Sequence, residues 1–220
     1  MRVLSHRGWW RSTSEKNTET AFRRSFDARC GTETDVRDMD GVLVISHDPP
    51  RSEASPLPFD AFLDIYVDSG AHDRGLPLAL NIKADGLASA LEDELRRRGV
   101  DRHAFVFDMS VPDMRSYVAG GLDVFTRHSE LEPAPALYKA SRGVWLDAFH
   151  DEAWIAPEIL EGHLAAGKSV CIVSPELHGR EPTDFWRRLR DWIRHRGGGD
   201  GLMMCTDLPA EAKEVFGDDD

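Results

Sequence analysis

Residues 4–48 contain four short motifs, L-S-H-R-G at 4–8, N-T-E-T-A-F at 17–22, G-T-E-T-D-V at 31–36 and D-G-V-L-V-I-S-H-D at 40–48. Three of them place polar side chains at the ends of short apolar runs. When such runs are parallel strands, their carboxyl ends meet at one edge of the sheet. We therefore expect two His, one Arg and two carboxylates to gather at one place, with the rest of the chain as their scaffold.

Short apolar runs recur along the chain and alternate with segments of helical spacing. The expected strands are residues 2–5, 32–36, 77–82, 104–107, 123–126, 144–146, 169–173 and 202–205. The expected helices are residues 18–29 with Asn17 as N-cap, 59–67, 87–98, 111–119, 157–166, 183–195 and a last one from Pro209 into the acidic tail 218–220. Only a brief turn near 136–140 is expected after the fifth strand, because Pro133 and Pro135 precede it.

This alternation predicts a parallel α/β sheet, and eight units close most naturally as a (β/α)8 TIM barrel. Asp40-Gly41 is a turn signal, so residues 42–46 are expected to return as a small β-hairpin insertion after the second strand. The proline-rich residues 49–58 then form a loop. A length of 220 residues fits a single domain over 1–220. An open doubly wound sheet is the structural alternative.

Composition limits the partners. A formal net charge of −12 argues against sequence-independent binding of nucleic acid and against docking on anionic membranes. Residues 1–8 lack a signal-peptide-like apolar stretch and no run reaches membrane-spanning length, so we expect a cytoplasmic protein without a stable membrane anchor. The three cysteines do not suggest a disulfide framework, and Cys171 and Cys205 are expected to be buried.

Glu33 and Asp35 alternate along the second strand, so both side chains point to the same side. Inside a barrel two unpaired carboxylates would be very costly. A hard divalent cation such as Mg²⁺ or Ca²⁺ prefers oxygen ligands and would resolve that cost. The alternative is an edge strand with both carboxylates in solvent.

Hydrolysis of a phosphodiester needs one proton removed from a nucleophile and one given to the leaving oxygen. His6 and His47 lie on neighbouring elements and are the candidates for these two roles. Arg7 and Lys83 are candidates for binding the phosphate oxygens. The alternatives are surface histidines and a solvated lysine.

These motifs, together with N-I-K at 81–83 and G-L-M-M-C-T-D-L-P at 201–209, resemble the glycerophosphodiester phosphodiesterase family, within the phosphatidylinositol-phospholipase-C-like barrels. The resemblance implies a (β/α)8 barrel and a divalent metal, Mg²⁺ or Ca²⁺, with Mn²⁺ also suitable. It implies the same roles: Glu33 and Asp35 as metal ligands, His6 and His47 as the acid–base pair.

Two positions depart from the family pattern. The family usually has Glu where this chain has Asn81, whose amide oxygen can still be a ligand but adds no charge. The seventh strand lacks the family's usual Trp and leads instead to Glu176 and His178, which are possible substrate-binding residues. Asp147 and Arg127 end other strands and are further candidates.

The sequence therefore predicts a metal-dependent phosphodiesterase for a small glycerophosphodiester-like substrate. A first alternative is a phospholipase of the same barrel group that acts on a phospholipid head group. A second is a protein that binds a phosphorylated ligand without hydrolysing it, because the third carboxylate is missing. An aldolase-like barrel would need a Schiff-base lysine, for which Lys83 is the only candidate. The oligomeric state is left open.

Overall fold

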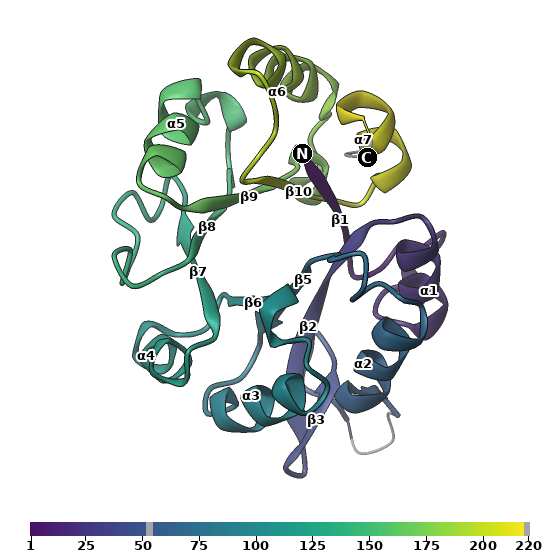
Figure 1. Cartoon of the computed structure of the whole chain (residues 1–220). Coiled ribbons are helices and arrows are strands. Elements are labelled where there is room, and N and C mark those ends of the chain that lie inside the picture. The colour runs from purple at the N-terminus through teal and green to yellow at the C-terminus, as the bar shows by residue number, and fades with distance from the viewer. Residues whose placement is uncertain (52–54, 218–220) are drawn as a thin grey trace. The chain divides into compact units, whose positions relative to one another are not determined.

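A computed structural model of the chain describes residues 1–51 and 55–217. Its strands are β1 Arg2–His6, β2 Gly31–Met39, β3 Val42–Ile45, β4 Leu57–Pro58, β5 Leu78–Ile82, β6 Ala104–Phe107, β7 Asp123–His128, β8 Gly143–Leu146, β9 Ser169–Val173 and β10 Leu202–Thr206. Its α-helices are α1 Glu19–Asp27, α2 Phe59–Asp68, α3 Ala88–Arg97, α4 Val111–Gly120, α5 Pro157–Ala165, α6 Thr183–Arg196 and α7 Pro209–Phe216 (Figure 1). The acidic tail expected to extend the last helix lies outside the described residues.

The strands pair in the order β1-β10-β9-β8-β7-β6-β5-β2-β3-β4, and β1 also pairs with β2. β2 pairs with β5 in parallel, and each strand from β5 to β10 pairs in parallel with the next. Pairing therefore returns to its start over eight strands, which is the topology of a (β/α)8 barrel. The predicted fold class is confirmed, and the pairing of β1 with β2 excludes an open sheet.

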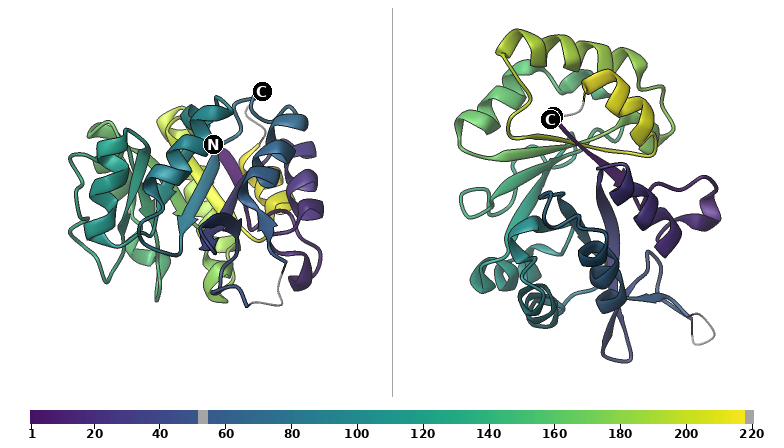
Figure 2. Two further views of the ribbon diagram at one scale, coloured as in Figure 1. Left: turned by 90° about the horizontal axis from the view of Figure 1, so that it is seen from below. Right: turned by 45° about the vertical axis from the view of Figure 1, so that its right-hand side comes forward.

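Strands β3 and β4 lie outside this ring. β3 pairs antiparallel with the end of β2, which confirms the predicted hairpin insertion (Figure 2). β4 pairs with β3 through Ile45 and Leu57, so the prediction of an entirely irregular loop over residues 49–58 is wrong at its end. Part of that loop, residues 52–54, lies outside the described residues.

The first helix also begins differently from the prediction. Its N-cap is Thr18, whose hydroxyl accepts a hydrogen bond from the Ala21 N–H, and not Asn17. Asn17 has a positive φ of 60°, and its side chain is turned toward β2. Between β7 and β8 the described chain forms turns without an α-helix, and Ala140 N–H donates to Leu137 O, as expected for residues 136–140.

Contacts divide the chain into two compact units, residues 5–124 and residues 1–4 with 125–220. The single-domain assignment over 1–220 stays a prediction. In the unit of residues 5–124, an apolar core packs α1, α2, α3 and α4 against one face of β2 and β5. Phe22 of α1 meets Phe62 of α2 edge to face, with ring centroids 4.6 Å apart.

The faces of β5 show which side chains remain for chemistry. Leu78, Leu80 and Ile82 belong to the core beneath the helices. Strand side chains alternate between faces, so Ala79 and Asn81 point to the opposite face. The site described below lies on that opposite face.

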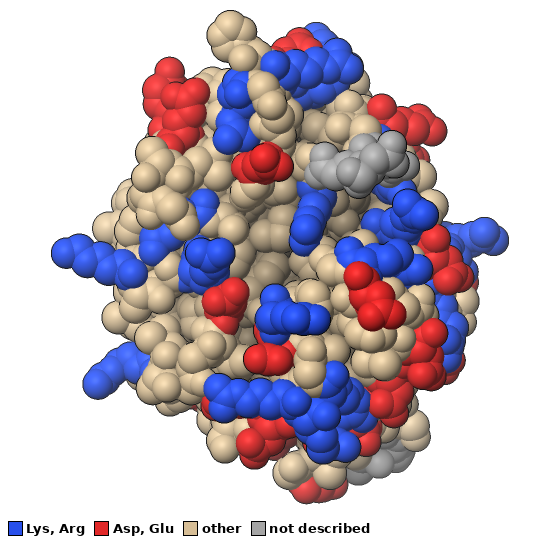
Figure 3. All heavy atoms as spheres, in the orientation of Figure 1, with Lys and Arg blue, Asp and Glu red and all other residues tan. Residues whose placement is uncertain are grey.

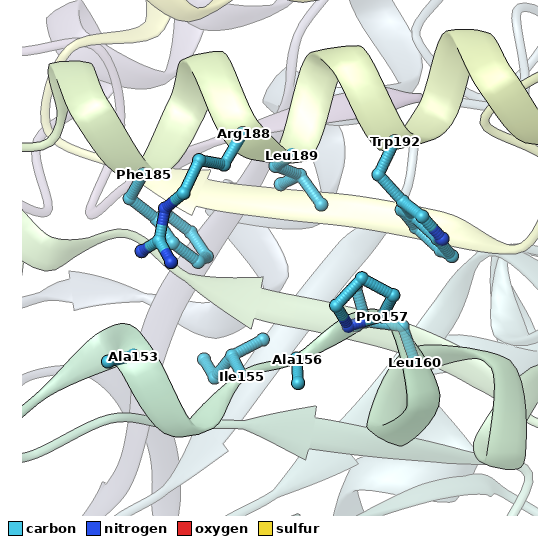
Figure 4. A pocket seen from close by; sticks show the side chains of 9 residues that line it. All are labelled: Ala153, Ile155, Ala156, Pro157, Leu160, Phe185, Arg188, Leu189 and Trp192. Carbon is cyan, nitrogen blue, oxygen red and sulfur yellow. The ribbon is translucent and has the colours of Figure 1, made fainter.

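In the unit of residues 125–220, a pocket of about 200 Å³ lies beside α5 and α6 (Figure 4). Phe185, Leu189 and Trp192 line it from α6, and Ile155 and Leu160 line it from the preceding segment and α5. Cys171 and Cys205 are buried, as expected, and Cys30 is buried as well. No described helix is long and apolar enough to cross a membrane. On the face drawn in Figure 3, basic and acidic side chains are interspersed.

Candidate active site

Glu33 and Asp35 are buried on the inner face of β2, with 1% and 0% of their surfaces exposed. Both lie in the continuous strand β2, where alternate side chains share a face, so they point to the same side as predicted. Their burial excludes the solvated edge-strand alternative. The register of β2 and β5 places Asp35 opposite Asn81, and Asn81 is also buried. Three oxygen-bearing side chains of two adjacent strands therefore share one face.

Two cationic side chains, Arg7 and Lys83, contact the carboxylate of Asp35. Arg7 Nε lies 2.9 Å from Asp35 Oδ2, an ion contact whose geometry is not that of an aligned hydrogen bond. Lys83 Nζ lies 3.4 Å from Asp35 Oδ1. About a fifth of each cationic side chain is exposed, 21% for Arg7 and 20% for Lys83. Both predicted phosphate-binding residues thus reach the carboxylate and solvent together.

Asn17 is a site residue that the sequence reasoning missed. Its Nδ2 donates to Asp35 Oδ2 at 2.9 Å, and its Oδ1 accepts from Thr34 Oγ1 at 2.9 Å. Both bonds require the side chain to lie along β2. Asn is among the residues that tolerate a left-handed backbone, but this tendency does not identify Asp35 as its partner.

The turn after β1 fixes Arg7. Arg7 has φ 60°, its N–H donates to Glu33 O at 3.0 Å, and its carbonyl accepts from Asn17 N–H at 2.9 Å. Gly8 follows with φ 81°, and a Cβ there would lie 2.7 Å from the Cβ of Ala21. Left-handed backbone costs energy for a residue with a Cβ, so the surrounding bonds must hold it in place.

His6 ends β1 beside the carboxylates. Its Nε2 lies 3.9 Å from Glu33 Oε2, and 17% of its side chain is exposed. Its carbonyl accepts a hydrogen bond from Trp10 Nε1 at 3.2 Å. This position suits a proton carrier that is open to a ligand on one side and faces a carboxylate on the other.

The pKa of Glu33 is raised from 4.5 to about 7, chiefly because the carboxyl is buried and also because of the negative charge of Asp35. The positive charges of His6, Arg7 and Lys83 act in the opposite direction and do not cancel the effect. The carboxyl therefore titrates near neutrality, where a bound cation would favour its ionised form.

His47 lies just beyond β3. Ser46 N–H donates to Asp35 O at 3.0 Å, so the hairpin brings the chain back to the inner-face carboxylates one residue before His47. The imidazole itself is exposed, and its Nδ1 lies 2.8 Å from Asp48 Oδ1. The hairpin thus positions the backbone of His47 close to Asp35, while its acid–base role stays a prediction.

The donor set fits a hard cation. Asp35 Oδ1 and Asn81 Oδ1 are buried and accept no hydrogen bond from the described residues. Within the same part of the chain, no three His, Cys, Asp or Glu side chains are arranged to hold a metal. A metal here would accordingly use two carboxylates and the neutral amide of Asn81, which are oxygen ligands suited to Mg²⁺ or Ca²⁺.

The other candidates belong to the unit of residues 125–220 and form contacts of their own. His178 Nε2 lies 2.7 Å from the buried Asp147 Oδ1. Glu176 accepts from Thr206 Oγ1 and from Asp207 N–H, and it also bonds Ser174. Those bonds tie the segment after β9 to the end of β10, which favours a structural role for Glu176.

Arg127 lies over the ring of Phe149, with its guanidinium carbon 5.3 Å from the centroid, and its Nε is 3.5 Å from Glu132. Of the four residues, His178 and Arg127 are the two whose side chains are partly exposed in these ion pairs, by 24% and 27%. Substrate binding by this group stays a prediction.

A comparison with protein-family models finds no match, and a comparison with curated proteins finds none either. Solved structures do match. A glycerophosphodiester phosphodiesterase from Parabacteroides distasonis ATCC 8503 has a TM-score of 0.71 at 16% identity, covering 98% of this chain and 96% of the other. The enzyme of the same name from Agrobacterium tumefaciens str. C58 has a TM-score of 0.70 at 16% identity, covering 97% and 99%.

A Ca²⁺-dependent phosphatidylinositol-specific phospholipase C from Streptomyces antibioticus is less similar, with a TM-score of 0.54 at 14% identity, covering 96% of this chain and 95% of the other. Sequence identity this low establishes the fold and leaves the chemistry to the site. The chain therefore has the fold of the glycerophosphodiester phosphodiesterases.

Proposed function

We propose that this protein is a divalent-metal-dependent phosphodiesterase that hydrolyses a small soluble glycerophosphodiester-like substrate. The observation that supports this most is the inner face of β2 and β5. Two buried carboxylates, two cations and a buried amide oxygen meet there, and no residue that the structure describes donates a hydrogen bond to Asp35 Oδ1 or Asn81 Oδ1. Such a set suits a cation and a phosphate together better than either alone.

The cationic residues would bind the phosphate, and the oxygen-bearing residues would bind the metal. Arg7 offers two parallel donors and Lys83 a point charge to the phosphoryl oxygens. A bound metal would be held by Glu33, Asp35 and Asn81, and it would polarise the phosphoryl oxygens. Both cations are anchored on Asp35, so they would position the phosphorus close to that carboxylate.

Hydrolysis breaks one P–O bond and forms another. The attacking oxygen is a water molecule or a neighbouring hydroxyl of the substrate, and its proton passes to one imidazole. The other imidazole protonates the leaving alkoxide. Attack by water yields an alcohol and a phosphomonoester, whereas attack by a neighbouring hydroxyl yields an alcohol and a cyclic phosphodiester, which water then opens to the phosphomonoester. His6, beside Glu33, and His47, on the hairpin, are the two candidates, and each can take either role.

A non-hydrolysing phosphate-binding protein is the second candidate, because Asn81 stands where a third carboxylate would strengthen metal binding. The assay that separates the two uses bis(p-nitrophenyl) phosphate and glycerophosphocholine with Mg²⁺, Mn²⁺ or Ca²⁺. We expect hydrolysis, reduced by at least about a hundredfold in His6→Ala and in His47→Ala. The exposed His195→Ala on α6 is the matched control.

Tight phosphate binding without turnover under any of the three metals would support the binding protein and refute the enzyme. Hydrolysis that survives both His6→Ala and His47→Ala would refute the acid–base assignment. A preference for phospholipid vesicles over glycerophosphocholine would support the phospholipase alternative.

A further inference from the structure

We infer that the divalent cation and the substrate phosphate bind to this site cooperatively, so that each weakens greatly when the other is missing. This inference rests on the proposed function and concerns the order and regulation of binding at the same site. It follows from the charges around Asp35 and from the neutral residue at position 81.

The charges at the site already balance without a metal. Glu33 and Asp35 supply two negative charges at most, and Arg7 and Lys83 supply two positive ones. Asn81 contributes an oxygen and no charge. A divalent cation that entered alone would therefore leave two uncompensated positive charges on a largely buried face. That is unfavourable, because low-dielectric surroundings strengthen every repulsion.

The repulsion between a bound cation and the positive side chains would be strongest at Asp35 Oδ1. Asp35 Oδ2 is occupied by Arg7 Nε and by the amide of Asn17, each at 2.9 Å. The remaining oxygen, Oδ1, faces Lys83 Nζ at 3.4 Å. A cation on Asp35 Oδ1 would accordingly meet the ammonium group of Lys83 and would have to displace it.

A phosphate group removes this conflict. Its oxygens can accept hydrogen bonds from Arg7 and Lys83 and can also be ligands of the cation. The partly exposed side chain of Lys83 can turn toward the phosphate, which frees Asp35 Oδ1. Linkage then requires the reverse effect, so the cation must tighten phosphate binding by the same factor.

The direct test is calorimetric titration of the full chain with Mg²⁺, with and without saturating glycerol phosphate as the phosphomonoester probe. Free Mg²⁺ is corrected for binding to the probe. We expect the affinity for Mg²⁺ to rise by about tenfold or more with glycerol phosphate, and the affinity for glycerol phosphate to rise equally with Mg²⁺. Equal Mg²⁺ affinities with and without the probe would overturn the inference.

Position 81 offers a matched pair of variants. Asn81→Glu adds a carboxylate, so Mg²⁺ should bind without glycerol phosphate and the coupling factor should shrink. The glutamine of Asn81→Gln has nearly the same shape as the glutamate of Asn81→Glu but no charge, so this variant should keep the coupling. If both variants bind Mg²⁺ alike, charge at this position is not the cause and the inference fails.

Lys83→Met provides a second route that does not alter the buried strand face. It should raise the affinity for Mg²⁺ alone and lower the affinity for glycerol phosphate. Unchanged Mg²⁺ affinity would contradict the proposed repulsion. Hydrolysis of diesters with no coupling would overturn this inference and leave the proposed function intact, whereas no binding of Mg²⁺ or glycerol phosphate in any combination would overturn both.

Discussion

Replacing Glu33 by Gln is expected to abolish a pH-dependent loss of stability in the metal-free protein. Burial, with the charge of Asp35, raises the pKa of Glu33 from 4.5 to about 7. A raised pKa in the folded state means that the folded chain holds this proton more tightly than the unfolded chain. The stabilisation is complete below pH 4.5 and is lost as the pH rises through about 7.

The size of the effect follows from the two values. At 1.36 kcal/mol for each pH unit between 4.5 and about 7, the loss amounts to about 3 kcal/mol of the free energy of unfolding. The glutamine side chain of the Glu33→Gln variant cannot ionise, and its carbonyl oxygen can still accept the Arg7 N–H that donates to Glu33 Oε2 at 3.2 Å. The variant should therefore be less stable than, or equal to, the natural chain at pH 5 and more stable at pH 8.5.

Urea unfolding in the presence of a chelator, followed by circular dichroism at both pH values, measures this difference. Glu19→Gln, at an exposed position of α1, is the control and should leave the pH dependence unchanged. Parallel pH profiles for the natural chain and the Glu33→Gln variant would refute the reasoning, because the carboxyl would then titrate alike in the folded and unfolded states.

Three further substitutions probe the surroundings of the site and the helix ends. Asn17→Gly keeps the positive φ of 60° but loses the hydrogen bond to Asp35, so diester hydrolysis should fall about tenfold with a small change in Tm; an unchanged rate would exclude a positioning role. Gly8→Ala should destabilise by more than about 2 kcal/mol in urea unfolding, because φ is 81° and the new Cβ would lie 2.7 Å from the Cβ of Ala21. Ala156→Ser should stabilise by about 1 kcal/mol, since Ala156 is the N-cap of α5 with an extended backbone and no described side chain caps this helix; a lower Tm would contradict this.

The sequence predicted the ring of strands well because each parallel strand is a short apolar run, and a segment of helical spacing separates most of these runs. The same property located Glu33, Asp35 and Asn81. Their alternation fixes which face they share, and the parallel register brings position 81 beside position 35. Features that follow from strand periodicity could thus be predicted from the sequence.

Features that depend on competition between side chains for the same partner could not be predicted from the sequence. Asn17 was predicted to be the helix cap, but Thr18 caps the helix, and the Asn17 side chain bonds Asp35 instead. Arg7 and Lys83 were predicted to bind a phosphate, and the sequence did not indicate that both would also contact the buried carboxylate of Asp35. The short strand β4 was missed because Leu57 and Pro58 are too few to show a period.

The residue at position 81 affects both cation binding and the stability of the metal-free protein, and a negative charge there would change the two in opposite directions. A third buried carboxylate opposite Asp35 would attract a cation, but without the metal it would add repulsion to a face where Glu33 already has a raised pKa. Asparagine keeps the oxygen and avoids that repulsion. Asn81→Glu should therefore lower the stability of the metal-free protein at pH 8.5 and regain it in excess Mg²⁺. Asn81→Gln should show neither change, and a metal-free Asn81→Glu protein as stable as the natural chain would show that charge repulsion at this face is not what limits it.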